Sequence, residues 1–225
     1  MSHLVVDSFL NLGPFAMNSY LVRDPSSHGA ILVDPGADSD LILNALRTTK
    51  STLQLIFLTH GHLDHVLAVP EILAAYPVPL WLPRLDEELY LHLVDQCAMF
   101  GLPPTAPSTK GLNLYDDGWQ MTLGSASGVA RHTPGHTPGS SVLYFAETAL
   151  LFGGDLLFQD SIGRTDLWGG DIHQMQSSLQ RVVTLPPTTV VHPGHGPQTT
   201  IGRELQQNSF VQAALAQKLA EEAGQ

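Results

Sequence analysis

Residues 59–65 read Thr-His-Gly-His-Leu-Asp-His and directly follow a nearly all-apolar run at residues 53–58. A run of this length and composition predicts a strand that is covered on both faces. Side chains two residues apart point the same way in extended backbone, so we expect His60, His62 and Asp64 on one side of the strand end. With His65 at the end of the stretch, these residues offer four metal ligands. That is more than a single segment usually supplies to one tetrahedral zinc ion that keeps a position open. The stretch therefore predicts two neighbouring metal ions that share these ligands.

Three turns further along the chain each offer one more candidate ligand. His136, Asp155 and His195 each follow a predicted strand and stand beside Gly or Pro. Turns at strand ends are where a rigid scaffold usually presents functional side chains. Asp155 matters most, because a carboxylate has two oxygens and can bridge two cations. We expect these three residues to supply what a two-metal site still lacks.

This ordered set resembles the metallo-β-lactamase fold superfamily, and within it the hydroxyacylglutathione hydrolase (glyoxalase II) branch. The matching residues, in chain order, are Asp34, His60, His62, Asp64, His65, His136, Asp155 and His195. The resemblance implies an α/β (α+β) fold, a four-layer αββα sandwich, and we expect residues 1–225 to form a single domain of this kind. It also implies that Asp34 orients the ligands rather than binding metal.

The resemblance further assigns the ligands to two metal sites. His60, His62 and His136 would hold the first ion, and Asp64, His65 and His195 the second, with Asp155 and a hydroxide bridging them. The implied reaction is hydrolysis of a thioester such as S-lactoylglutathione by attack of that hydroxide, which Asp64 positions. We expect zinc, with iron or manganese as alternatives, because bound zinc can lower the pKa of water to about 7.

The chain resembles the short bacterial members of this branch, which lack the C-terminal glutathione-binding domain, since it ends at residue 225, soon after His195. Glutathione is therefore only one candidate for the thiol carrier. Arg164, in the Gly-Arg-Thr-Asp sequence at residues 163–166, is a candidate to anchor a substrate carboxylate. The alternative for Arg164 is an ion pair with Asp166 that holds this loop.

The same Gly-Arg-Thr-Asp loop occurs in the persulfide dioxygenases, which bind one iron through residues matching His60, His136 and Asp155. That facial arrangement leaves three positions open for the sulfur substrate and O₂. The sequence keeps the ligands for either arrangement, so the metal count and identity stay open, although the intact second ligand set favours a dinuclear hydrolase. A β-lactamase is disfavoured because the second metal site offers Asp155 and no Cys. A structural zinc protein is disfavoured because such sites are closed and usually rich in thiolate.

The composition and charge of the chain disfavour some partners and exclude some kinds of site. The formal net charge is −11, from 10 Lys and Arg against 21 Asp and Glu, which disfavours nucleic acid and anionic lipid as partners. The single cysteine, Cys97, excludes an internal disulfide and a multi-thiolate zinc site. No apolar run approaches the ~20 residues of a membrane span, and the N-terminus lacks a secretory pattern. We expect a cytoplasmic protein whose partner is a small-molecule thioester, with no nucleic acid and no membrane.

The rest of the sequence alternates short β-branched runs with helical patterns. In the final helix, Phe210, Ala214, Leu215 and Leu219 are expected on the inner face. Strands are expected at residues 4–9, 19–23, 30–34, 53–58, 79–82, 119–123, 128–132, 141–145, 149–152 and 188–192, and helices at residues 39–48, 66–75, 85–99, 172–183 and 209–222.

Overall fold

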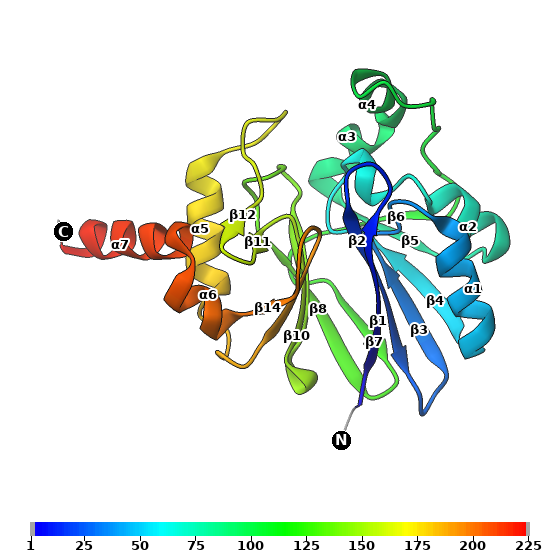
Figure 1. Cartoon of the computed structure of the whole chain (residues 1–225), viewed down its shortest axis with the longest axis horizontal. Helices are drawn as coiled ribbons and strands as arrows, with labels where there is room; N and C mark the ends of the chain where they lie inside the picture. Colours follow the sequence, from blue (N-terminus) through cyan, green and yellow to red (C-terminus); the bar gives the residue numbers. More distant parts are fainter. Residues whose placement is uncertain (1–2, 224–225) are drawn as a thin grey trace.

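Two β-sheets face each other at the centre of the molecule, and helices cover their outer faces (Figure 1). The computed structural model describes residues 3–223, without the side chains of residues 221 and 222. The first sheet has the order β1-β2-β3-β4-β5-β6, with strands β1 (Val5–Leu12), β2 (Met17–Asp24), β3 (Gly29–Val33), β4 (Thr52–Phe57), β5 (Leu80–Pro83) and β6 (Leu112–Tyr115). The second has the order β14-β13-β10-β9-β8-β7, with strands β7 (Gln120–Leu123), β8 (Ala126–His132), β9 (Ser141–Phe145), β10 (Leu150–Gly154), β13 (Val190–Pro193) and β14 (Thr199–Thr200).

The helices divide between the two outer faces. Those beside the first sheet are α1 (Ser39–Thr49), α2 (Val69–Ala75), α3 (Glu87–Leu91) and α4 (Leu93–Met99), and those beside the second are α5 (Ile172–Val182), α6 (Ile201–Gln207) and α7 (Ser209–Ala223). Short 3₁₀ turns form at Leu63–His65, Arg84–Asp86 and Ala146–Thr148, and a small ribbon pairs β11 (Leu157–Phe158) with β12 (Ser161–Ile162). This arrangement confirms the predicted four-layer αββα sandwich. None of the helices in the described part of the chain is long and apolar enough to cross a bilayer.

Three separate apolar clusters fill the three interfaces between these layers. Phe57 and Phe145 belong to the cluster between the sheets, Ile42 to the one under α1 and α2, and Leu179 to the one under α5. Strand β4 contributes to two of them, since Phe57 faces the other sheet and Ile56 faces the helices. Burial on both faces explains why this strand is apolar almost throughout.

Parallel pairing brings the candidate site together at one end of the sheets. Strand β3 pairs in parallel with β4, so the residues that follow them, Asp34 and Thr59, lie side by side. Strand β10 pairs in parallel with β13, which brings the turns of Asp155 and His195 to the same edge. The carboxyl ends of parallel strands are where α/β folds usually place their sites.

The remaining predicted elements are present with shifted bounds, but the helix predicted at residues 85–99 is wrong as a single element. It is divided into α3 and α4, which meet at His92. The helix predicted at residues 66–75 begins only at Val69, because the chain first makes the 3₁₀ turn Leu63–His65. The short elements β6, β11, β12, β14 and α6 were not expected.

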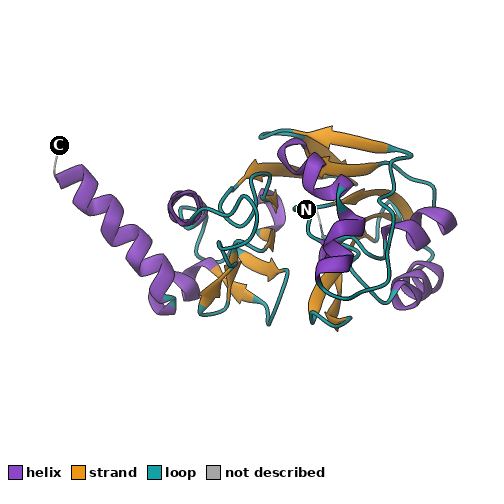
Figure 2. Ribbon diagram, turned by 90° about the horizontal axis from the view of Figure 1, so that it is seen from above, coloured by secondary structure: helices purple, strands orange, loops and turns teal. Residues whose placement is uncertain are grey.

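The predicted inner face of the last helix is wrong in part. Phe210 is 45% exposed and Leu219 is 67% exposed, whereas Val211 and Ala214 are buried. Figure 2 shows the reason, because α7 extends away from the body of the molecule, so the neighbouring elements cover only part of its surface. Cys97, by contrast, is fully buried in the cluster beneath the first sheet's helices.

Candidate metal centre

The structure brings all seven predicted ligands together at one end of the two sheets. They form three overlapping groups in which the potential ligand atoms all lie within 4.8 Å of one another. These groups are His60 with His62 and His136, His60 with His65 and Asp155, and Asp64 with His65 and His195. Residues 60–65 follow the first sheet's strand β4, whereas the other three follow strands of the second sheet. The cluster therefore lies where the two sheets meet.

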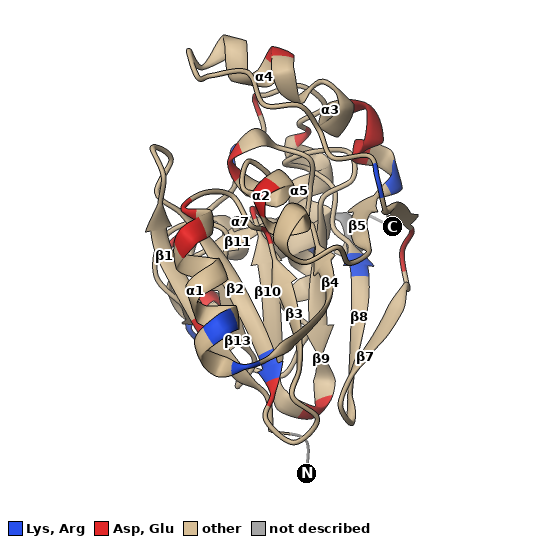
Figure 3. Ribbon diagram, turned by 90° about the vertical axis from the view of Figure 1, so that its right-hand side faces the viewer, with Lys and Arg blue, Asp and Glu red and all other residues tan. Residues whose placement is uncertain are grey.

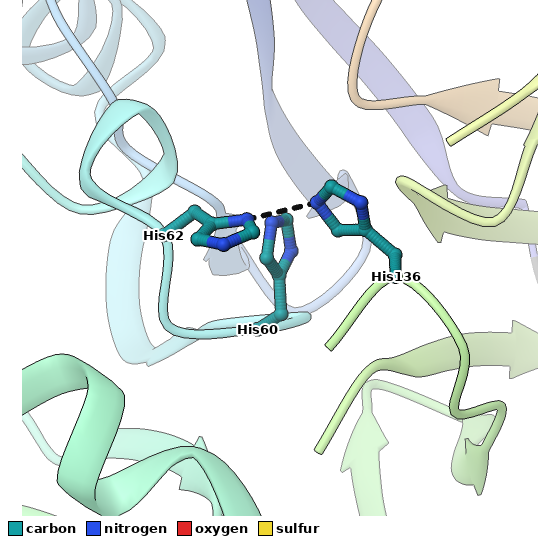
Figure 4. A group of neighbouring side chains, drawn as sticks. All are labelled: His60, His62 and His136. Atoms are coloured by element: carbon teal, nitrogen blue, oxygen red, sulfur yellow. Dashed lines mark hydrogen bonds between the residues drawn. The ribbon is translucent and has the colours of Figure 1, made fainter. Parts of the chain in front are cut away.

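The first group consists of three imidazole rings that point toward one another (Figure 4). The Nδ1 atom of His62 lies 2.8 Å from Nε2 of His136. The ring centroid of His60 is 5.0 Å from that of His62 and 4.9 Å from that of His136. Three nitrogens at this spacing can coordinate one cation that lies between them.

The carboxylate of Asp155 lies between this group and the second one. Its Oδ2 is 3.4 Å from Nε2 of His136, and its Oδ1 is 3.3 Å from Nε2 of His65. On the far side, Nε2 of His195 lies 3.2 Å from Oδ2 of Asp64 and 3.5 Å from Oδ2 of Asp155. The Asp155 carboxylate thus lies near His136 of the first group on one side and near His65 and His195 of the second group on the other, as a carboxylate that bridges two ions would.

Three buried atoms of the cluster have no hydrogen-bond partner within the described residues. They are Nε2 of His60, Nε2 of His65 and Oδ1 of Asp155. Leaving a buried polar atom unpaired is unfavourable, and natural proteins rarely do so without a reason. All three belong to one of the groups of neighbouring ligand atoms, so cations bound at this cluster would satisfy them. The residues present therefore fit a metal centre.

Asp34 fixes the orientation of two of these histidines. Its Oδ2 accepts a hydrogen bond from Nδ1 of His65 at 3.0 Å and another from the Thr59 hydroxyl at 2.7 Å. The Thr59 hydroxyl also lies 3.0 Å from Nδ1 of His60. Because the hydroxyl already donates its proton to Asp34, its oxygen accepts in this contact and the His60 imidazole donates. Both histidines then carry the proton on Nδ1 and direct the lone pair of Nε2 into the cluster, as metal ligands do. Asp34 thus contacts His65 directly and His60 through Thr59 without being one of the candidate ligands, and its role in orienting them for metal binding stays a prediction.

The loop that contains Arg164 orients a third histidine through its backbone. Nδ1 of His136 lies 2.7 Å from the Arg164 carbonyl oxygen, which can only accept, so Nε2 of His136 is free to face the cluster. The Arg164 guanidinium itself pairs with both carboxylate oxygens of Asp166, at 2.7 and 2.8 Å. Of the two roles predicted for this side chain, the structure contains the ion pair that holds the loop.

Burial and neighbouring charges shift the pKa values of the cluster residues in different directions. Burial lowers the pKa of His60 well below its ordinary value, and that of His62 to about 3, so both are neutral. Burial acts to raise the pKa of Asp155, but the charge of His65 outweighs it and holds this pKa well below the usual range. Burial acts to lower the pKa of His65, yet the neighbouring carboxylates raise it well above its ordinary value. The neutral imidazoles of His60 and His62 beside the anionic carboxylate of Asp155 favour a cation, and a metal ion bound at His65 would replace the proton that this imidazole otherwise holds.

Asp86 is a functional residue that the sequence did not indicate. Its side chain is fully buried and accepts hydrogen bonds from the Gly61 amide at 2.9 Å, the Thr137 hydroxyl at 2.7 Å and the Gly139 amide at 2.6 Å. It therefore joins the turn of His60 and His62 to the turn of His136. A Cβ atom at Gly139 would lie 2.6 Å from the Asp86 carboxyl, which explains the glycine there. No local signal reveals this role, because Asp86 reads in sequence as an ordinary acidic residue near a helix start.

Strand β2 supports the remaining ligand turn from the first sheet. The amide of Asn18 donates to the carbonyl oxygens of Pro193 at 3.1 Å and of Gly196 at 2.8 Å. The Tyr20 hydroxyl donates to the same Pro193 oxygen at 2.6 Å. These bonds hold the turn of His195, which follows a strand of the second sheet, against the first sheet.

A cavity of about 360 Å³ opens onto the cluster, and five of the ligands line it. Its other walls are mostly apolar and include Phe15, Phe100, Phe158, Ile162 and Leu167. The rings of Phe15 and Phe100 meet edge to face at 5.4 Å. The cavity can therefore hold a small molecule whose reacting group faces the ligands and whose remaining part contacts apolar side chains.

The pattern of the family described as "Metallo-beta-lactamase superfamily" matches residues 12–195. The chain belongs to this superfamily. It is a metal-dependent hydrolase by family, and its His and Asp cluster suits two metal ions. The hydroxyacylglutathione hydrolase GloC of Haemophilus influenzae is 33% identical over 199 residues, which cover 88% of this chain and 93% of that protein.

Two solved structures of this superfamily also resemble the chain along most of its length. The crystal structure of the BLEG-1 B3 metallo-beta-lactamase is 35% identical with a TM-score of 0.84, and the match covers 92% of this chain and 99% of that one. The crystal structure of TTHA1623 in a di-iron-bound form is 38% identical with a TM-score of 0.81, over the same shares of the two chains. The proteins similar to this chain thus include one named as a hydroxyacylglutathione hydrolase, one named as a metallo-beta-lactamase and one solved with two iron ions.

Proposed function

We propose that this metallo-β-lactamase superfamily member hydrolyses thioesters at a dinuclear centre. Water adds to the thioester carbonyl, the carbon–sulfur bond breaks, and a carboxylic acid and a thiol are released. The observation that carries the proposal is the pair of three-residue ligand groups on either side of the Asp155 carboxylate. The similarity to a protein named hydroxyacylglutathione hydrolase supports the thioester as the reacting group.

The ligand assignment that we propose follows the three groups. One ion would be held by His60, His62 and His136 and the other by Asp64, His65 and His195, with Asp155 between them. Two divalent ions, for which zinc is our first choice, would supply an activated water molecule and a Lewis acid for the carbonyl oxygen. The di-iron-bound relative makes iron the first alternative.

Asp64 is placed to position the attacking water. Its carboxylate lines the cavity and lies 3.2 Å from Nε2 of His195. Burial acts to raise the pKa of Asp64, but the charge of His65 outweighs it and lowers this pKa, so the group is an anion that accepts a hydrogen bond. A thiolate leaves without a proton donor, so the chain needs no separate general acid in this reaction.

The test is metal analysis together with turnover. The purified protein is stripped with a chelator, reloaded with zinc, iron or manganese, and assayed with S-lactoylglutathione and with a neutral thioester. We expect two ions per chain and thioester cleavage, and we expect Asp64→Asn to lose both the second ion and turnover. Asp116→Asn, which alters an exposed aspartate outside the cavity, is the matched control and should retain both. Absence of cleavage in protein that holds two ions of any of these metals would refute the proposal.

A persulfide dioxygenase is the second candidate, because His60, His136 and Asp155 by themselves provide a two-histidine, one-carboxylate set. Such an enzyme would combine one persulfide with O₂ and water and release a thiol and sulfite. One bound iron per chain and oxygen consumption with a persulfide would favour it. We expect neither, because the Asp64, His65 and His195 group is complete.

β-Lactams are a third substrate class to include in the assay, because one similar structure is that of a B3 metallo-beta-lactamase. The leaving group of a β-lactam is an amide nitrogen, which needs a proton as the bond breaks, whereas a thiolate does not. We therefore expect thioesters to be cleaved with the higher kcat/KM by the same preparation.

A further inference from the structure

A second hollow lies beside the metal cavity. It is a groove of about 380 Å³ on α3 and α4, and its apolar lining is formed by Leu89, Met99 and Trp168. Met99 is 78% exposed and Trp168 is 56% exposed. Large apolar side chains gathered in a surface groove are typical of a binding site rather than of ordinary surface.

The groove adjoins the metal cavity, because residues that are neighbours in the chain line the two. Phe100 lines the cavity and its neighbour Met99 lines the groove. On the other side, Leu167 lines the cavity and its neighbour Trp168 lines the groove. A molecule whose reacting group lies at the ligand cluster can therefore extend between these pairs into the groove.

The charges around both hollows disfavour an anionic occupant. Arg164 is the one lysine or arginine among the described residues that line them, and its guanidinium is already paired with Asp166. The groove is lined instead by the acidic residues Glu88 and Asp95, the second of which lies 2.8 Å from Nδ1 of His92, and Figure 3 shows acidic residues on both α3 and α4. Glutathione and similar carriers bring carboxylates or phosphates, which these groups would repel.

We propose that this groove, formed by Leu89, Met99 and Trp168, binds an uncharged, apolar arm of the thioester substrate. The enzyme then prefers thioesters with such an arm over thioesters of anionic carriers such as glutathione. The inference rests on the thioester hydrolysis proposed above, and it names the substrate class of that site. Met99 and Trp168 act as specificity-determining residues, since they contact the arm and not the reacting atoms.

The test uses the full-length, metal-loaded protein and neutral thioesters of N-acetylcysteamine with acetyl, butanoyl and hexanoyl groups. Each methylene that enters an apolar site gains transfer free energy, so we expect kcat/KM to rise on the order of 10- to 100-fold from acetyl to hexanoyl. Trp168→Ala and Met99→Ala should flatten this rise. Phe210→Ala is the control, because it removes a 45% exposed aromatic ring on α7, which lines neither hollow. It should keep the parent's rise of kcat/KM with acyl length.

Binding of non-hydrolysable compounds separates this inference from the proposed reaction. The S-methyl and S-hexyl thioethers of N-acetylcysteamine are titrated by calorimetry into the parent protein and the Trp168→Ala variant. Tighter binding of the S-hexyl compound that depends on Trp168 would support the groove even if no thioester were cleaved, in which case only the proposed reaction fails. Equal affinity for both thioethers, or a higher kcat/KM for S-lactoylglutathione than for the neutral lactoyl thioester, would overturn the inference.

Discussion

Replacing Asp34 by Asn tests whether the orientation of the histidines governs metal binding. Asp34 is buried and does not lie among the candidate ligands, but its Oδ2 accepts hydrogen bonds from His65 and from the Thr59 hydroxyl. Asn keeps the size of the side chain and tolerates the positive φ of 48° at this position. It also retains an oxygen for the Thr59 amide, which lies 2.7 Å from Oδ1. The substitution therefore changes one atom from acceptor to donor.

The magnitude follows from the bonds that this atom makes. An amide NH₂ in place of Oδ2 faces the Nδ1–H group of His65, so that imidazole must move its proton to Nε2, the nitrogen directed at the cluster. Loss of such a supporting contact typically lowers metal affinity 10- to 100-fold, or about 1.4–2.8 kcal/mol. The bond from the Thr59 hydroxyl to this charged group is weakened as well, by up to about 1.5–3 kcal/mol, and part of this appears as lower folding stability.

The assay is competition for zinc with a chromophoric chelator, run beside urea unfolding of the chelated protein. Glu204→Gln is the matched control, because Glu204 is equally buried and accepts hydrogen bonds from Thr199 and Asn208, which are not candidate ligands. We expect both variants to unfold at lower urea concentration, but only Asp34→Asn to release zinc more readily. If Asp34→Asn bound both ions as tightly as the parent, the orienting role assigned to Asp34 would be wrong.

Four further outcomes follow from the same contacts. Asp155→Ala should weaken both ions together, as metal analysis at a series of chelator concentrations would show; retention of two tightly bound ions would contradict a bridging role. Asp86→Asn should lower kcat and metal affinity while KM for the substrate stays unchanged, since it alters the spacing of two ligand turns rather than the cavity; an effect on KM alone would argue against this. Burial lowers the pKa of His192 to about 4, so the unfolded state binds more protons between pH 6.5 and 4, and stability should fall by about 3 kcal/mol as the pH drops through this range. Urea unfolding at several pH values checks this, and His192→Phe should remove that share of the slope. Removing the metal with a chelator should lower the free energy of unfolding. For each ion that was present at 100 times its Kd, the loss should be about 2.7 kcal/mol. Calorimetry that showed the same Tm before and after chelation would refute metal binding by the folded state.

The part of the site that the sequence predicted best is the part encoded locally. Residues 60–65 directly follow a strand whose two-sided burial is visible in its composition, so their common placement follows from strand geometry. His136, Asp155 and His195 were predicted as further ligands because each lies in a turn with Gly or Pro after a strand, and the resemblance to a family assigned them to the two metal sites. Their approach depends on the pairing of β10 with β13 and on the packing of the sheets, neither of which a single segment encodes.

The features that the sequence did not predict depend on contacts between distant segments. Asp86 acquires its role from three donors on two turns, 25 to 53 residues away in the chain. Phe210 and Leu219 fit an amphipathic pattern but remain exposed, because periodicity does not say how far the neighbouring layer extends. The break at His92 is a third case, because the sequence pattern of a helix continues through this residue, whereas the helical conformation of the backbone is interrupted there.

The candidate ligands come from both sheets, and this links metal affinity to the packing of the two halves. Residues 60–65 follow a strand of the first sheet, and Asp155 and His195 follow strands of the second. Hydrogen bonds cross this boundary beside the ligand turns, among them the bond from the Tyr20 hydroxyl to the Pro193 carbonyl. The cavity lies on the same boundary, with Phe100 on one side and Phe158 on the other. A substitution that shifts the sheets relative to each other, such as Tyr20→Phe, would therefore change the spacing of the ligands and the width of the cavity together, so metal affinity and substrate preference should vary in parallel.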